Sequence, residues 1–117
     1  MRFIGMLPPM TLLQKRDADR QRQRLVLFDR TREELRAALA EILPASKVIV
    51  FGSLTKRGVF NAASDIDIAL FEEPMGKSIF GFVAEIEERM RRPVDVLLLE
   101  KTRLKEKILR EGELWTT

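Results

Sequence analysis

Three aspartates lie in apolar surroundings, within "SDIDIAL" (64–70) and "PVDVLLLE" (93–100): they are Asp65, Asp67 and Asp95. Because side chains alternate along a strand, Asp65 and Asp67 would point to the same face, about 7 Å apart at their α-carbons. Two carboxylates that close raise each other's pKa unless a cation lies between them. If the strand of Asp95 lies beside the first strand, all three can converge. This pattern is typical of a site where two Mg²⁺ ions hold a nucleoside triphosphate and an attacking hydroxyl in line.

The preceding stretch, "FGSLTKRG" (51–58), could bind the phosphates. Gly52 follows an apolar strand and permits a sharp turn against a ligand. Ser53 offers a hydroxyl at the start of a short predicted helix, where free amides attract anions. Lys56 and Arg57 follow within a turn and can neutralise phosphate charge. We therefore predict a phosphate-binding corner formed by these four residues.

Each of these features also has an ordinary structural explanation. A Gly-Ser pair commonly forms a turn, and an Asp-x-Asp pair commonly lies on the exposed face of an amphipathic strand. A single aspartate such as Asp95 can cap a helix or pair with a base, and Lys56 and Arg57 can belong to a solvated loop. Their order on consecutive predicted strands favours one shared site over four unrelated explanations.

Composition limits the chemistry that such a site could perform. The 117 residues contain no cysteine and no histidine, which excludes disulfides, thiol nucleophiles and histidine bases. Catalysis would have to use carboxylates, hydroxyls, Lys or Arg with a cation that prefers oxygen ligands. The net charge of +3 is too small to indicate a nucleic-acid-binding protein by itself.

The elements that must position these residues can be read from the apolar pattern. Strands are predicted at 47–51, 64–70 and 93–100, with a short edge strand at 113–115. Helices are predicted from Thr31, where "TREEL" has the form of a capping box, to Pro44, then over 78–90 and 102–111. In the last helix, Leu104, Ile108 and Leu109 are expected to face inward. These elements predict an α/β (α+β) fold, a small mixed β-sheet with helices packed on one face.

The N-terminal segment differs in composition from the rest. We expect residues 1–30 to form an irregular arm (1–10) and a polar helix (Thr11–Phe28), and residues 31–117 to form the functional domain. The basic stretch 14–24 alone would suit a small nucleic-acid-binding regulator, but the absence of tyrosine argues against base stacking. A homo-oligomer or a partner complex could bury the apolar residues outside the predicted core, which are Phe3, Ile4, Leu12, Leu13, Val26, Leu27 and Phe28.

No signal peptide or membrane-spanning stretch is evident in the sequence, so the cytoplasm is the expected location.

The motif "FGSLTKRG…SDIDIAL…VDVLLL…ILREGELW" resembles the signature of the DNA polymerase β-like nucleotidyltransferase superfamily, and is most similar to its minimal nucleotidyltransferases. The resemblance covers roughly residues 32–115. It implies that Gly52 and Ser53 bind triphosphate, that Asp65 and Asp67 hold metal, and that Asp95 completes the triad and helps to activate an acceptor hydroxyl. The usual "GSxARG" is one residue longer here, as "GSLTKRG".

The same resemblance implies a biological role. Minimal nucleotidyltransferases are commonly antitoxins of modules whose toxin is a HEPN-domain RNase. The chain would then use Mg²⁺ to transfer AMP from ATP to a tyrosine hydroxyl of a HEPN toxin. The alternative is a binding module that neutralises its partner sterically, with an inactive or merely nucleotide-binding site.

Overall fold

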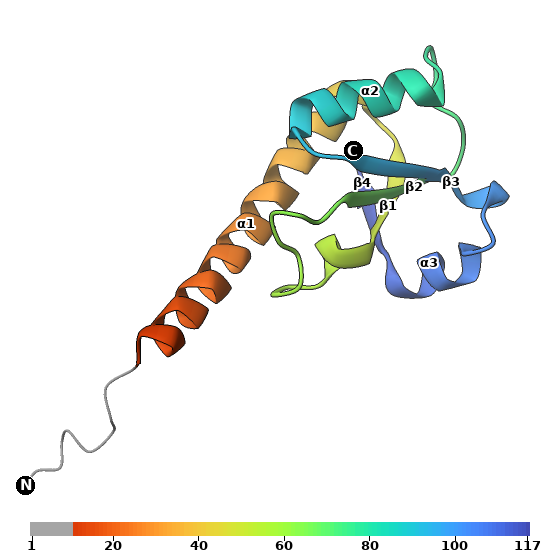
Figure 1. Cartoon of the computed structure of the whole chain (residues 1–117). Helices are drawn as coiled ribbons and strands as arrows, with labels where there is room; N and C mark the ends of the chain where they lie inside the picture. Colours follow the sequence, from red (N-terminus) through yellow and green to blue (C-terminus); the bar gives the residue numbers. More distant parts are fainter. Residues whose placement is uncertain (1–10) are drawn as a thin grey trace, which may run out of the picture.

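The computed structural model describes residues 11–117, so the predicted arm at 1–10, with Phe3 and Ile4, lies outside the described residues. The first element of the described residues is a single long helix, α1 (Leu12–Ile42) (Figure 1). Thr11 caps this helix: its hydroxyl accepts from the Gln14 amide, and the Gln14 side chain accepts from the Thr11 amide. A polar helix from Thr11 onward is therefore confirmed.

The predicted helix start at Thr31 is wrong. Thr31 lies inside α1 and is only 2% exposed. Residues 12–42 contain neither glycine nor proline, so nothing interrupts the helix until Leu43, just before Pro44. The predicted boundary between residues 30 and 31 consequently falls within a continuous helix.

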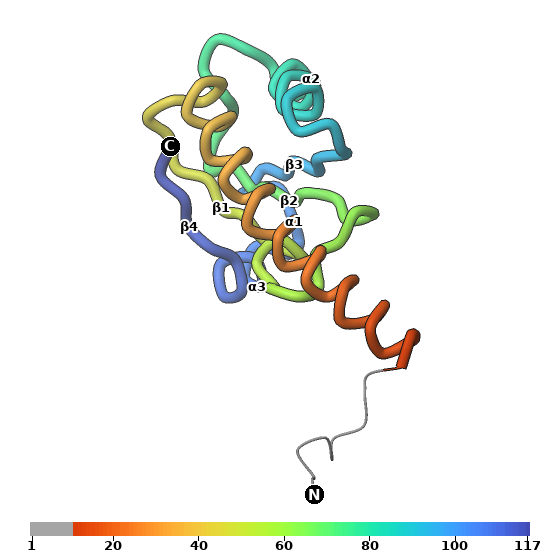
Figure 2. The backbone as a smooth tube through the Cα atoms, turned by 90° about the vertical axis from the view of Figure 1, so that its left-hand side faces the viewer, coloured from red at the N-terminus to blue at the C-terminus, as the bar shows by residue number. Residues whose placement is uncertain are grey.

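Only the C-terminal half of α1 packs on the domain. Its buried residues begin at Phe28, and the preceding turns extend away from the sheet (Figures 1 and 2). Leu12, Leu13 and Val26 are 60–76% exposed on this projecting part. The helix therefore joins a packed half, which supports the sheet, to a half that projects from the domain.

The sheet has four strands: β1 (Lys47–Phe51), β2 (Ile66–Leu70), β3 (Val94–Leu98) and β4 (Glu113–Thr116). Their order is β3-β2-β1-β4. β2 and β3 are parallel and are connected through α2 (Ile79–Met90), whereas β1 is antiparallel to both of its neighbours. The predicted mixed sheet and its short edge strand are confirmed.

Helices α1 and α2 cover one face of this sheet, as predicted. The core there includes Leu35 and Leu39 of α1, Phe82 and Ile86 of α2, and the strand residues Val48, Val50, Ile66, Ile68, Leu70 and Val94. The short helix α3 (Lys105–Glu111) lies against the opposite face (Figure 1), where Ile108 packs with Ile49, Ala69 and Leu99.

The prediction that Leu104 and Leu109 face inward is wrong. They are 48% and 50% exposed, whereas Ile108 is 3% exposed. The helix has only seven residues and begins after Leu104, so a single side chain, Ile108, is buried under it. Within residues 11–117, no helix combines the length and the apolar character needed to cross a membrane.

Candidate active site

Asp67 and Asp95 are brought together by the parallel pairing of β2 and β3. The two residues are direct partners in the register, so their side chains lie on the same face of the sheet. This is the face opposite α1 and α2, because Ile66 and Ile68 fill the core on the other side. The expectation that the strand of Asp95 lies beside that of Asp67 is confirmed.

The electrostatics of this pair are unfavourable for two ionised carboxylates. Burial raises the pKa of Asp67 to about 6, helped by the negative charges of Asp95 and Asp65 and by a side-chain hydrogen bond with Asp95. Asp67 is half-buried, while Asp95 is exposed. Burial is thus the main cause of the raised pKa of Asp67, and the like charges of the two neighbouring acids add to it.

Asp65 is close enough to act on Asp67 through its charge, but it is not gathered with the other two acids. It precedes β2 and is exposed, because the pairing with β3 begins only at Ile66. Among residues 11–117, no group of three or more acidic side chains lies close enough together to hold a metal ion. The structure thus assembles a pair of acids with a third acid nearby.

This donor set is suited to Mg²⁺. The ion prefers oxygen ligands and is typically held by one or two protein carboxylates, with substrate phosphates and water completing its coordination. Asp67 and Asp95 can provide two such carboxylates, and a cation between them would remove the repulsion that raises the pKa of Asp67. Asp65 lies at the edge of this site and could approach when a cation binds.

The Gly-Ser corner lies directly against Asp67. Phe51, the last residue of β1, is paired with Asp67 across the sheet. Gly52 follows with φ +73°, and a β-carbon at this position would lie 2.2 Å from Asp67 Oδ2. Glycine is therefore needed here both for the backbone conformation and for the close approach of the carboxylate.

Ser53 belongs to a short 3-10 helix, η1 (Gly52–Thr55), that starts at this corner. The Thr55 hydroxyl donates to the Gly52 carbonyl at 2.7 Å, which closes the turn. Leu54 anchors it in the core with no exposed surface. The corner is consequently a compact turn next to the acids, as the sequence predicts.

The side chains of Lys56 and Arg57 lie in different surroundings. Arg57 Nη1 donates to Asp29 Oδ1 of α1 at 2.7 Å, so this side chain is engaged by the helix. Lys56 lines a cavity of about 150 Å³ between β1, η1 and α3, together with Phe51, Gly52, Thr55, Leu104, Lys107, Ile108 and Glu111. The structure thus places Lys56, but not Arg57, beside Gly52. Lys107 is a second cation at this cavity that the sequence analysis missed.

A larger cavity, of about 640 Å³, lies at the other end of the sheet. It is lined by residues 42–47 and 70–75, which form the start of β1, the end of β2 and the segments next to them. None of the three aspartates borders it. Size alone therefore does not identify the reactive site in this fold.

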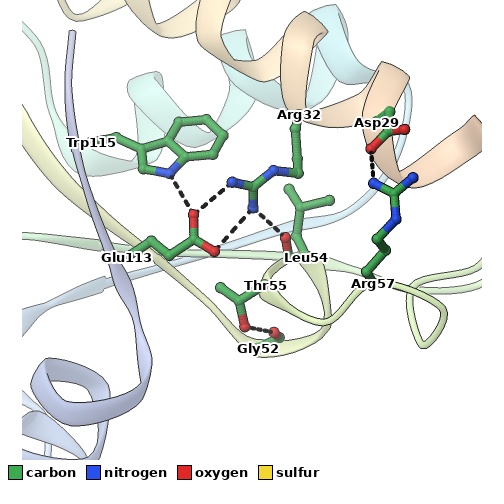
Figure 3. A network of polar contacts seen from close by, with 8 residues as sticks. All are labelled: Asp29, Arg32, Gly52, Leu54, Thr55, Arg57, Glu113 and Trp115. Carbon is green, nitrogen blue, oxygen red and sulfur yellow. Dashed lines mark hydrogen bonds and ion pairs between the residues drawn. The ribbon is translucent and has the colours of Figure 1, made fainter. Parts of the chain in front are cut away.

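Two half-buried arginines that support the corner and the segment before the acids were also missed. Arg32 of α1 donates to the Leu54 carbonyl and to Glu113 of β4 (Figure 3). Arg92, just before β3, donates to the Ser64 carbonyl at 2.7 Å and lies over the Phe60 ring. In the sequence both belong to polar stretches that resemble solvated surfaces, so their composition carries no signal of this role.

Comparison with known proteins agrees with this geometry. The family "Polymerase beta, Nucleotidyltransferase" matches residues 33–116. A solved structure of a minimal nucleotidyltransferase superposes with a TM-score of 0.58 at 26% identity, covering 74% of this chain and 93% of that one. No curated protein matches the sequence closely enough to count as a relative.

A second solved structure, a toxin–antitoxin with AMP-PNP, superposes with a TM-score of 0.56 at 21% identity, covering 73% of each chain, and shares the fold. The family match includes the Gly-Ser corner and all three aspartates, and extends over most of the chain. The chain therefore belongs to the polymerase β nucleotidyltransferase family.

Proposed function

We propose that this chain is a Mg²⁺-dependent nucleotidyltransferase that transfers AMP from ATP to a tyrosine hydroxyl of a partner HEPN toxin and thereby acts as its antitoxin. The observation that carries the proposal is the close approach of the Asp67 carboxylate to Gly52, where a β-carbon would have no room; Asp67 is itself in register with Asp95. A corner that can receive phosphates thus lies directly beside acids that can hold a cation.

The chain's own residues have distinct roles in this proposal. The Gly52–Ser53 corner and Lys56 bind the triphosphate, and Asp67 and Asp95, with Asp65, hold two Mg²⁺ ions. The bound ions supply positive charge to the phosphates and lower the pKa of the acceptor hydroxyl. The acceptor oxygen bonds to the α-phosphorus as the bond to the β-phosphate oxygen breaks, and pyrophosphate leaves. In this proposal, Asp95 receives the hydroxyl proton.

The partner is proposed from the context of the fold. One structural neighbour is a toxin–antitoxin with AMP-PNP, which is consistent with nucleotide use in such an assembly. Most residues of the projecting half of α1 are exposed, and they offer a surface on which a partner could dock. We therefore propose a cytoplasmic module of two proteins, in which the partner docks on α1 and the site uses a nucleotide.

The alternative, a steric antitoxin with an inactive or merely nucleotide-binding site, has one observation in its favour. Asp65 is not gathered with Asp67 and Asp95 in the described part of the chain. If ligand binding does not draw Asp65 in, the site could bind nucleotide without turning it over.

The test combines the purified chain, its partner and ATP-Mg²⁺, followed by intact-mass measurement of the partner. The proposal predicts a gain of one or more adenylyl groups with the wild-type chain and none with a D65N/D67N double variant. Transfer by the double variant would contradict this site. Neutralisation of the partner without any mass gain would support the steric alternative.

A further inference from the structure

The side chain of Arg32 connects three elements that meet behind the Gly-Ser corner (Figure 3). From α1, its Nη1 donates to the Leu54 carbonyl of η1 at 2.7 Å. Its Nη2 donates to Glu113 Oε1 of β4 at 2.6 Å, and Nη1 also reaches Glu113 Oε2 at 3.3 Å. The guanidinium thus holds one carboxylate with both terminal nitrogens and one backbone carbonyl of the corner.

The surroundings of Arg32 hold this geometry in place. Its guanidinium carbon lies 5.1 Å from the Phe28 ring centre and 5.2 Å from that of Trp115, and its side chain is only 19% exposed. Trp115 Nε1 donates to the same Glu113 carboxylate at 3.3 Å. The hydrogen bond from Arg32 is the main reason that the pKa of Glu113 lies below its ordinary range. An arginine that lies over two aromatic rings and is held by a bidentate carboxylate has little rotational freedom.

The position of the accepting carbonyl gives this network a consequence for the site. Leu54 directly follows Ser53, so the carbonyl that Arg32 holds belongs to the same turn as the amides next to Gly52. The other hydrogen bonds of this turn, from Thr55 to Gly52 and from the Lys56 amide to Ser53, are internal to it. Arg32 therefore ties the turn to α1 and β4 and limits its rotation relative to the sheet.

We propose that Arg32 is a positioning residue that preorganises the Gly52–Ser53 corner for the triphosphate of the nucleotide. This inference rests on the proposed function, because it assigns to Arg32 the orientation of that same phosphate site. Preorganised donors bind a polyanion more tightly since less ordering is required on binding. Arg32 belongs to α1, which covers the sheet face opposite Asp67 and Asp95, and it acts on the site through the Leu54 carbonyl.

A purely structural role for Arg32 predicts lower stability without a specific effect at the corner. Arg36 provides a matched control on the same helix. It lies over the same Trp115 ring, 4.1 Å from its centre, and has no hydrogen bond to η1. An R36M variant thus loses an arginine–tryptophan contact and leaves the tie to Leu54 intact, whereas R32M loses both.

The experiment compares wild type, R32M and R36M by amide hydrogen exchange of the nucleotide-free protein, and by calorimetric titration with AMP-PNP and Mg²⁺. In R32M we expect exchange within residues 52–57 to accelerate about tenfold and the dissociation constant of AMP-PNP to rise about tenfold, since one hydrogen bond from a charged donor is lost. R36M should remain within about twofold of wild type in both measurements.

Unchanged exchange at 52–57 in R32M, or equal weakening of nucleotide binding in R32M and R36M, would overturn the proposal. If R32M does not fold, E113Q replaces it. This variant weakens the anchor of Arg32 but keeps the bond to Leu54, so exchange at 52–57 should accelerate by about threefold, and no acceleration would overturn the proposal. If exchange is faster in R32M but the wild type binds no AMP-PNP, the proposed function and the phosphate-positioning role are both overturned, and Arg32 is only an anchor of the turn.

Discussion

Replacing Asp67 by asparagine should stabilise the metal-free protein at pH 8 and have almost no effect at pH 4. Asparagine has the same shape but carries no charge. The substitution therefore removes the repulsion from Asp95 and Asp65 and lowers the cost of burying this side chain. Wild-type Asp67 is already protonated at pH 4, where the two proteins are nearly equivalent.

The direction of the pKa shift of Asp67 explains why D67N is expected to be more stable than wild type at high pH. The native pKa of Asp67 is about 6, above its ordinary value of 3.8, so the native state binds this proton more tightly than the unfolded chain does. The stability gained from the bound proton is complete below about pH 4. It is lost as the pH rises through 6, and D67N does not undergo this loss.

The size of the effect is limited by solvent. The difference between the ordinary pKa of Asp67, 3.8, and its native pKa of about 6 corresponds to at most about 3 kcal/mol in the free energy of unfolding. Asp67 is only half-buried and Asp95 is exposed, so screening reduces this value, and we expect about 1 kcal/mol. For a chain of 117 residues, that difference raises the Tm by about 4 °C.

Urea unfolding of wild type and D67N across pH 4–8, without divalent ions, measures this difference directly. D65N is the matched control, because Asp65 is exposed and a smaller contributor to the shift at Asp67. We expect the advantage of D67N over wild type to grow between pH 4 and 7 and to exceed that of D65N. An advantage that does not change with pH, or a D67N protein less stable than wild type at pH 8, would refute the reasoning.

Three further predictions concern the same site. G52A should lower the free energy of unfolding, measured in urea, by about 3 kcal/mol, because its β-carbon would meet Asp67. The control G76A, with φ +77° and nothing within 4 Å of its β-carbon, should lower it by only about 1 kcal/mol. Equal losses in the two variants would contradict the close approach of Gly52 and Asp67. Saturating Mg²⁺ added in the presence of AMP-PNP should raise the Tm of wild type at pH 8 but not that of D67N, and an equal rise in both would place the ion elsewhere. R92M should accelerate amide exchange around Ser64, because the Ser64 carbonyl loses its donor. Exchange in α2 should remain unchanged. If the amides around Ser64 are as protected in R92M as in wild type, Arg92 does not hold this segment.

Much of the fold could be predicted because it depends on local apolar patterns. The run "KVIVF" and the alternation around Asp67 predicted the central strands, and the helical spacing of apolar residues over 78–90 predicted α2. The proximity of Asp67 and Asp95 also followed, because both lie at equivalent places on strands that the fold makes neighbours.

The parts that could not be predicted depend on tertiary context. "TREEL" has the local form of a helix start at Thr31, but the helical residues that precede it allow α1 to continue through it. Arg32 and Arg92 look like surface residues in the sequence. Their partners are a carboxylate 81 residues away and a carbonyl 28 residues away, and such pairings are fixed only when the sheet forms.

The central claim is that Asp67 and Asp95 share a cation beside the Gly-Ser corner when nucleotide binds. Electron paramagnetic resonance of Mn²⁺, titrated into the protein with AMP-PNP, measures this binding directly. We predict a protein-bound Mn²⁺ signal that depends on the nucleotide and is lost in both D67N and D95N. Mn²⁺ bound with undiminished affinity by either variant would contradict the claim.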